Sequence, residues 1–62
     1  MLIRYSEPAD NESGYREVTV SREEAIRIQR DTASRIRPGF TYESDEQALE
    51  DFITIHWAWI LP

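Results

Sequence analysis

The sequence predicts an α+β fold: a single small β-β-α-α-β domain over residues 1–62, with a three-stranded, mainly antiparallel sheet packed on two helices. Three observations predict it. Residues 1–6 and 15–20 alternate apolar and polar side chains, as half-buried strands do. Two segments that begin at serines have the three-to-four-residue apolar spacing of amphipathic helices. Residues 57–61 alternate again and supply the third strand, which an isolated hairpin needs for stability.

The hairpin is predicted from alternation on both sides of a turn-forming segment. In residues 1–6, Arg4 lies between two apolar positions, and in residues 15–20 polar residues alternate with valines. The positions expected to face inward are Ile3, Tyr5, Val18 and Val20. Residues 7–14 are rich in turn-forming residues and hold no large apolar side chain, which is typical of an exposed loop. The two strands are therefore expected to pair antiparallel.

The first helix is predicted to begin at Ser21, because Glu24 follows three residues later and the pair can form a capping box. At about 100° per residue one side is apolar or small. Its members are Ala25, Ile28, Gln29, Thr32, Ala33 and Ile36, with Ile26 at the edge. The ion pairs expected on the other side are Glu23 with Arg27 and Asp31 with Arg35. Pro38 disfavours helical geometry in the residue before it and ends the helix.

The second helix is predicted to begin at Ser44, which forms a capping box with Gln47. Its inward positions are Ala48, Leu49, Phe52 and Ile53. We expect the helix to run to about Ile55 and to turn near His56, because histidine is moderately enriched in left-handed backbone geometry. Residues 57–61 then form the third strand. The alternative is a helix that continues to Trp59 and packs against a partner.

The charge is negative and unevenly distributed. Twelve acidic residues face seven arginines, giving a net charge of −5, with −2 in residues 1–21, +2 in residues 22–42 and −5 in residues 43–62. This balance favours solubility and opposes general affinity for nucleic acid or anionic membranes. The absence of cysteine excludes a disulfide framework and a thiolate zinc site.

An arginine stripe lies on the first helix. Arg27, Arg30, Ser34 and Arg37 fall within about one quadrant of it. Such a stripe suits phosphate recognition, because guanidinium groups pair bidentately with phosphate oxygens. The interpretation that we favour is a solvated face whose arginines pair locally or with the acidic second helix. Nucleic-acid engagement through Arg27, Arg30 and Arg37 stays as the alternative function.

An acidic cluster surrounds the start of the second helix. Its members are Glu43, Asp45, Glu46, Glu50 and Asp51. It can mimic a phosphate backbone or dock on a basic partner, and Glu46 and Glu50 are its candidate interaction residues. The plainer interpretation is a solvated face together with the preference of a helix N-terminus for negative charge. An acid/base pair is disfavoured because nothing in the sequence indicates burial of either carboxylate.

The last aromatic residues have two interpretations. Trp57 and Trp59 lie on one face if their segment is a strand, and core packing is the commoner use of such a pair. The alternative is an interface anchor, since tryptophan is enriched at binding hot spots. The apolar area of these tryptophans in a chain this short also makes a homodimer an open expectation. His56 has neither a nucleophile nor further metal-binding residues beside it, so a structural role is expected.

Residues 42–59, Y-E-S-D-E-Q-A-L-E-D-F-I-T-I-H-W-A-W, resemble the C-terminal segment of small uncharacterised proteins of bacteria and their phages. The stretch V-S-R-E-E-A at residues 20–25 is similar to the helix start in such chains. The resemblance implies a compact cytoplasmic domain and brings no catalytic or binding residues. Its phage association favours a protein that binds a host macromolecule.

The function that the sequence favours is a non-enzymatic, acidic binding module that docks on another protein as a regulator or inhibitor. No glycine-rich phosphate loop, nucleophile–base pair or metal-binding spacing is present, so neither enzyme activity nor a cofactor is expected. No segment has the features of an export signal or a membrane span, and a cytoplasmic location is expected.

Overall fold

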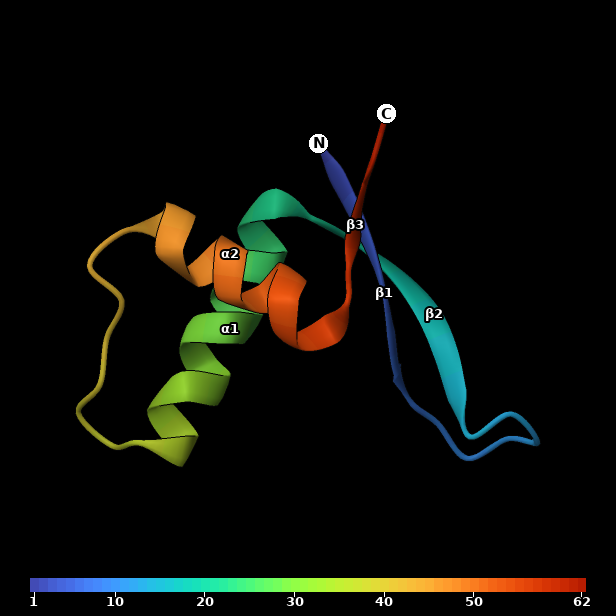
Figure 1. Cartoon of the computed structure of the whole chain (residues 1–62). Helices are drawn as coiled ribbons and strands as arrows, with labels where there is room; N and C mark the ends of the chain where they lie inside the picture. Colours follow the sequence, from blue (N-terminus) through green and yellow to red (C-terminus); the bar gives the residue numbers. More distant parts are fainter.

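A computed structural model describes residues 1–62 and confirms the predicted α+β architecture (Figure 1). In chain order, the elements are β1 (Leu2–Pro8), β2 (Tyr15–Ser21), α1 (Arg22–Ile36), α2 (Asp45–His56) and β3 (Trp59–Leu61). Both helices lie on one side of the sheet, and a long connection joins the end of α1 to the start of α2 (Figure 1).

The sheet is antiparallel with strand order β2-β1-β3, so the first strand is central. Ile3 pairs with Val20 on one neighbour and with Ile60 on the other. The β1–β2 turn is closed by Gly14, whose backbone N–H donates to the Asn11 side chain at 2.9 Å. Gly14 has φ 83°, a left-handed conformation that glycine adopts without steric cost. The predicted hairpin is confirmed, but Glu7 and Pro8, predicted to lie in the loop, extend β1 and pair with Arg16 and Tyr15.

The core lies between the sheet and the helices. Its buried members are Ile3, Tyr5, Val20, Ala25 and Phe52. The Tyr5 and Phe52 rings meet edge to face with their centroids 4.9 Å apart, an arrangement favoured by the ring quadrupoles. The inward positions predicted for both strands and for α2 are buried or half-buried. Thr32 and Ile36, predicted to face inward, are exposed, Ile36 by 81%, because the C-terminal part of α1 is not covered by the core.

Each helix begins at the predicted serine. The Ser21 hydroxyl accepts a hydrogen bond from the Glu24 backbone N–H at 3.1 Å, and the Ser44 hydroxyl accepts one from the Gln47 backbone N–H at 3.2 Å. The Glu24 carboxylate accepts from Arg27 at 3.0 Å. Arg27 therefore pairs with Glu24 rather than with the predicted Glu23, whereas the predicted Asp31–Arg35 pair is present at 2.8 Å.

The end of α2 differs from the prediction by one residue. His56 remains helical, and Trp57 adopts the left-handed conformation with φ 54°. The cause is packing, because the His56 ring lies 4.5 Å from the Phe52 ring and 5.0 Å from the Tyr5 ring, centroid to centroid. The backbone N–H groups of Trp57 and Ala58 both donate to the Ile53 carbonyl and close the helix. The third strand exists but begins at Trp59, so the alternative of a helix continuing to that residue is wrong.

Candidate functional site

The connection between the helices, residues 37–44, is fixed in place by α1. Arg30 donates to the Tyr42 carbonyl at 3.2 Å and to the Asp45 carboxylate at 2.9 Å. It also lies 3.4 Å from the Thr41 hydroxyl. One guanidinium group thus joins α1, the connection and the first turn of α2, which suits its several diverging donors.

Tyr42 extends this attachment to the middle of both helices. Its hydroxyl accepts from the Gln29 amide at 2.8 Å and donates to the Asp51 carboxylate at 2.8 Å. Gln29 is only 4% exposed, so this bond satisfies a polar group that would otherwise be buried without a partner. Desolvation by burial raises the pKa of the Tyr42 phenol, the Gln29 bond lowers that pKa, and the Asp51 carboxylate raises it. The neutral phenol is the form that the site holds.

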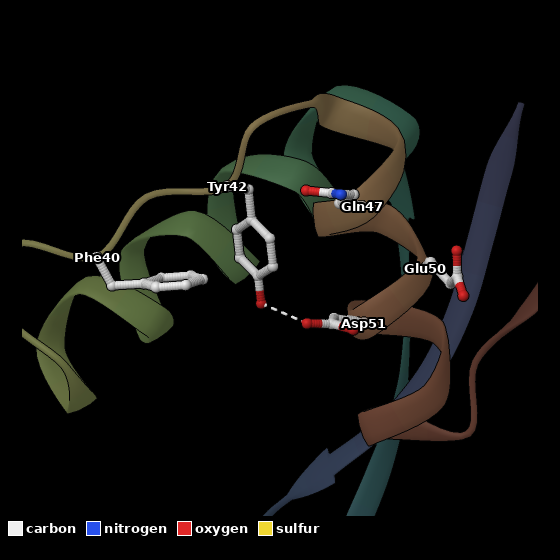
Figure 2. Close-up of a pocket in the computed structure, with 5 residues that line it drawn as sticks. All are labelled: Phe40, Tyr42, Gln47, Glu50 and Asp51. Atoms are coloured by element: carbon white, nitrogen blue, oxygen red, sulfur yellow. Dashed lines mark hydrogen bonds between the residues drawn. The ribbon is translucent and has the colours of Figure 1, made fainter.

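A depression of about 350 Å³ opens at this point and is lined by Phe40, Tyr42, Gln47, Glu50 and Asp51 (Figure 2). The Phe40 and Tyr42 rings stand nearly perpendicular, with an interplanar angle of 84° and centroids 5.0 Å apart. In Figure 2 the Tyr42 hydroxyl points toward Asp51, and Glu50 lies at the far rim on α2. The two rings and the Asp51 carboxylate therefore face the same space, whereas the Glu50 carboxylate lies on the side of α2 away from the rings (Figure 2).

A second, more apolar groove of about 270 Å³ adjoins the depression and shares Phe40 and Tyr42 with it. Its other lining residues are Gln29, Ala33, Ile36, Arg37 and Ile55. The exposed side chain of Ile36 therefore lines this groove and is not part of the core. We call the depression and the groove together the aromatic cleft.

The arginine stripe is largely engaged within the chain. Arg30 holds the connection, as described above, and Arg27 pairs with Glu24. The Arg37 guanidinium lies over the Phe40 ring, 5.6 Å from its centroid. The three candidate arginines therefore have separate intramolecular contacts and are not arranged as one free phosphate-binding surface.

The acidic cluster divides into engaged and unengaged members. Glu46 pairs with Arg22 at 3.2 Å, and Asp45 pairs with Arg30 at 2.9 Å. Glu43, Glu50 and Asp51 form no ion pair. Glu50 and Asp51 both line the aromatic cleft, whereas Glu46 does not.

The two tryptophans do not form a core pair. Trp57 is 87% exposed and Trp59 is 43% exposed. The prediction of core packing is wrong for Trp57, because the left-handed residue that ends α2 is Trp57 itself and the strand starts two residues later. With Trp57 outside the strand, the predicted common strand face is also wrong.

His56 is half-buried, and desolvation lowers the pKa of its imidazole from the usual 6.5. Its ring contacts with Tyr5 and Phe52 give it a structural role. Nowhere do three histidine, aspartate or glutamate side chains gather in a way that could hold a metal ion.

Phe40 and Tyr42 line the cleft but are not among the interaction residues predicted from the sequence. The signal for them was present: two aromatics separated by one residue, directly after Pro38-Gly39, lie on the same side of an extended segment. The Gln29 and Arg30 contacts that hold this segment are 12 to 13 residues apart in sequence, and no local pattern shows them.

The fold and the cleft define a small two-layer α+β domain with a fixed interhelical connection. No known protein family, curated protein or solved structure matches this chain. Neither helix combines the length and the apolar character that crossing a bilayer requires.

Proposed function

We propose that this protein is a non-enzymatic binding module that docks on another protein, and that the aromatic cleft receives a partner segment with a basic side chain next to an apolar one. The observation that carries the proposal is that three features adjoin: the perpendicular rings of Phe40 and Tyr42, which we call the aromatic corner, two carboxylates without ion pairs, and an apolar groove. The two carboxylates are those of Glu50 and Asp51. The rings and the carboxylates match the basic side chain of such a segment, and the groove matches its apolar side chain.

The charge of the molecule supports a cationic ligand. Five ion pairs engage five arginines and five acidic residues. Of the seven arginines and twelve acidic residues, two arginines and seven acidic residues stay outside these pairs. Two of the seven, Glu50 and Asp51, line the depression. An arginine or lysine of the partner would form there the ion pair that Glu50 and Asp51 do not form within this chain.

The aromatic corner supports the same ligand. A cation over an aromatic face is attracted by the ring quadrupole, by about 0.5–2 kcal/mol. Arg37 already occupies such a position over Phe40, so a guanidinium group of the partner is expected at the Tyr42 ring. A second guanidinium group can contact Tyr42 while its N–H groups donate to the Asp51 carboxylate. The adjoining groove then receives the neighbouring apolar side chain.

Nucleic-acid binding has less support. Phosphate recognition requires guanidinium groups that are free to reach backbone oxygens. Arg27 and Arg30 are each engaged by carboxylates, and Arg37 lies over Phe40. The resemblance to small bacterial and phage proteins stays a prediction and agrees with a role as a regulator or inhibitor of another protein.

The test is an NMR titration of the labelled protein with a short peptide that carries an arginine between two leucines, at low salt. We expect shift changes confined to residues 40–51 and to the other residues that line the cleft, which are Gln29, Ala33, Ile36, Arg37 and Ile55. The double variant Glu50→Gln, Asp51→Asn should weaken the affinity at least about tenfold, since a charge-assisted hydrogen bond contributes roughly 1.5–3 kcal/mol.

The matched control is Asp10→Asn, Glu12→Gln, which removes the same charge from the exposed β1–β2 turn. It should leave the affinity close to that of the parent. Equal weakening by both double variants would reduce the effect to net charge and contradict the cleft. Shift changes elsewhere on the surface would contradict it as well.

A further inference from the structure

The sheet has one face without any helix on it. Alternate residues of a strand point to opposite faces, so the strand positions between the buried residues Ile3, Tyr5 and Val20 belong to the other side. From the register, that side carries Leu2, Arg4, Ser6, Pro8, Tyr15, Glu17, Thr19, Trp59 and Leu61. Figure 1 shows α1 and α2 on one side only. We call this uncovered side the open face.

The open face is apolar at both ends and charged in the middle. Leu2 lies opposite Leu61 at one end, and Pro8 lies opposite Tyr15 at the other. Leu2 is 50% exposed and Tyr15 is 53% exposed. Between these ends lie Arg4 and Glu17, and neither forms an ion pair. The only side-chain bond of Arg4 is the one that it donates to the Thr19 hydroxyl, at 3.2 Å.

The molecule also exposes more surface than a folded monomer of the same mass usually does. Its accessible area is 4719 Å², whereas the scaling relation for folded monomers gives about 4,200 Å² at 7.3 kDa. The extents are 37 × 28 × 16 Å, so the molecule is thin in one direction. A second layer on the open face would reduce this exposed surface.

We propose that the open face binds a second copy of this chain, sheet against sheet, in a two-fold symmetric dimer. In an isologous contact the same surface must complement itself. If the two-fold axis runs across the strands, each strand lies antiparallel on its own copy. The Leu2 end then meets the Tyr15 end of the partner copy. Arg4 lies over the partner copy's Ser6, and the partner copy's Glu17 lies beside that residue on the neighbouring strand.

This arrangement forms two ion pairs across the interface and places apolar side chains at both ends. The other simple two-fold axis, along the strands, places Arg4 against the second Arg4 and is disfavoured by repulsion. The two seven-residue strands β1 and β2 give a contact of about 24 by 10 Å, since β3 has only three residues at one end of the sheet. A contact of this size belongs with the weak, reversible interfaces that bury less than about 1,200 Å² in total.

The proposal is independent of the aromatic cleft, which is formed by α1, α2 and their connection. Its test is sedimentation equilibrium of the full chain from about 10 µM to about 1 mM. We expect a reversible change from 7.3 kDa toward twice that mass. Arg4→Glu and Glu17→Arg should each weaken dimerisation about tenfold or more, because each brings like charges together.

The decisive variant combines both changes. Arg4→Glu with Glu17→Arg restores opposite charges across the proposed interface, so it should recover the dimer that each single variant loses. Arg4 and Glu17 are also diagonal neighbours within one chain, so circular dichroism of each single variant must show that it is folded while its dimer is lost. Glu12→Arg, a charge reversal in the β1–β2 turn, should leave the association unchanged.

Three results would overturn the proposal. The parent chain could stay at the monomer mass up to about 1 mM. A dimer could form that neither Arg4→Glu nor Glu17→Arg weakens, which would place the contact elsewhere, for example at the β3 edge. The double variant could also fail to recover the association while circular dichroism shows that it is folded.

Discussion

The two helices take part in two regions that differ in kind. Toward the sheet they are joined by apolar packing, in which Phe52 and Ala25 are fully buried against Ile3. Toward the interhelical connection they are joined by hydrogen bonds, from Gln29 through Tyr42 to Asp51. The apolar region holds the elements together. The polar region holds residues 37–44 in one position and so gives the aromatic cleft its shape.

The apolar and the polar region therefore tolerate different kinds of substitution. Apolar burial is non-directional and roughly proportional to area, so the loss of a large side chain costs stability directly. A hydrogen-bond chain is directional, and its net contribution is smaller, but a partner left unsatisfied in a buried position is costly. Substitutions in the first region should therefore unfold the protein, and those in the second should alter the cleft.

The largest effect is expected from Phe52→Ala. Phe52 is completely buried and contacts the rings of Tyr5 and His56. Truncation of such a phenylalanine costs about 3–5 kcal/mol, which is a large fraction of the roughly 5–15 kcal/mol that stabilises an ordinary domain. Urea unfolding followed by circular dichroism should show a severe loss of stability or an unfolded chain.

Its control is Ile55→Ala on the same helix, at a side chain that is 59% exposed. This change should shift the free energy of unfolding by about 0.5 kcal/mol or less. Equal destabilisation by the two variants would mean that the apolar region does not dominate the stability.

A smaller effect is expected from Tyr42→Phe. The change removes the hydroxyl that satisfies the buried Gln29 amide and that donates to Asp51. Leaving a buried donor unsatisfied costs about 1–3 kcal/mol. Tyr15→Phe, at an exposed ring with no side-chain hydrogen bond, should cost close to nothing. If the two variants unfold at the same urea concentration, the hydrogen-bond chain does not contribute to stability.

Local signals in the sequence were enough for most of the fold. Ser21 and Ser44 begin helices because a serine hydroxyl accepts from a backbone N–H three residues on, and this bond depends only on neighbours in sequence. The alternation around Ile3 and Tyr5 likewise indicated which strand face is buried. These features follow from the period of each element and needed no knowledge of its neighbours.

The cleft and the end of α2 depend on contacts between distant residues. The position of the left-handed residue is predicted one place too early, because the contact between the His56 and Tyr5 rings joins residues 51 positions apart. The expected pairing of the stripe with the acidic second helix is found for Arg30 and Asp45, but the bond of Arg30 to the connection between the helices is not among the predictions. Helical periodicity shows the direction of a side chain but not the partner that it meets there.

The smallest effect is expected from pH, and it probes the apolar region. Burial lowers the pKa of His56 below its usual 6.5, so the unfolded chain takes up a proton at a higher pH than the folded one. Between these two pKa values the unfolded state binds more protons, and stability therefore falls as the pH drops through about 6.5 and below. The urea midpoint should be lower at about pH 5.5 than at about pH 7.5. His56→Gln should make the difference between the two urea midpoints smaller. If the difference is as large in this variant as in the parent, other groups cause it and the His56 imidazole does not.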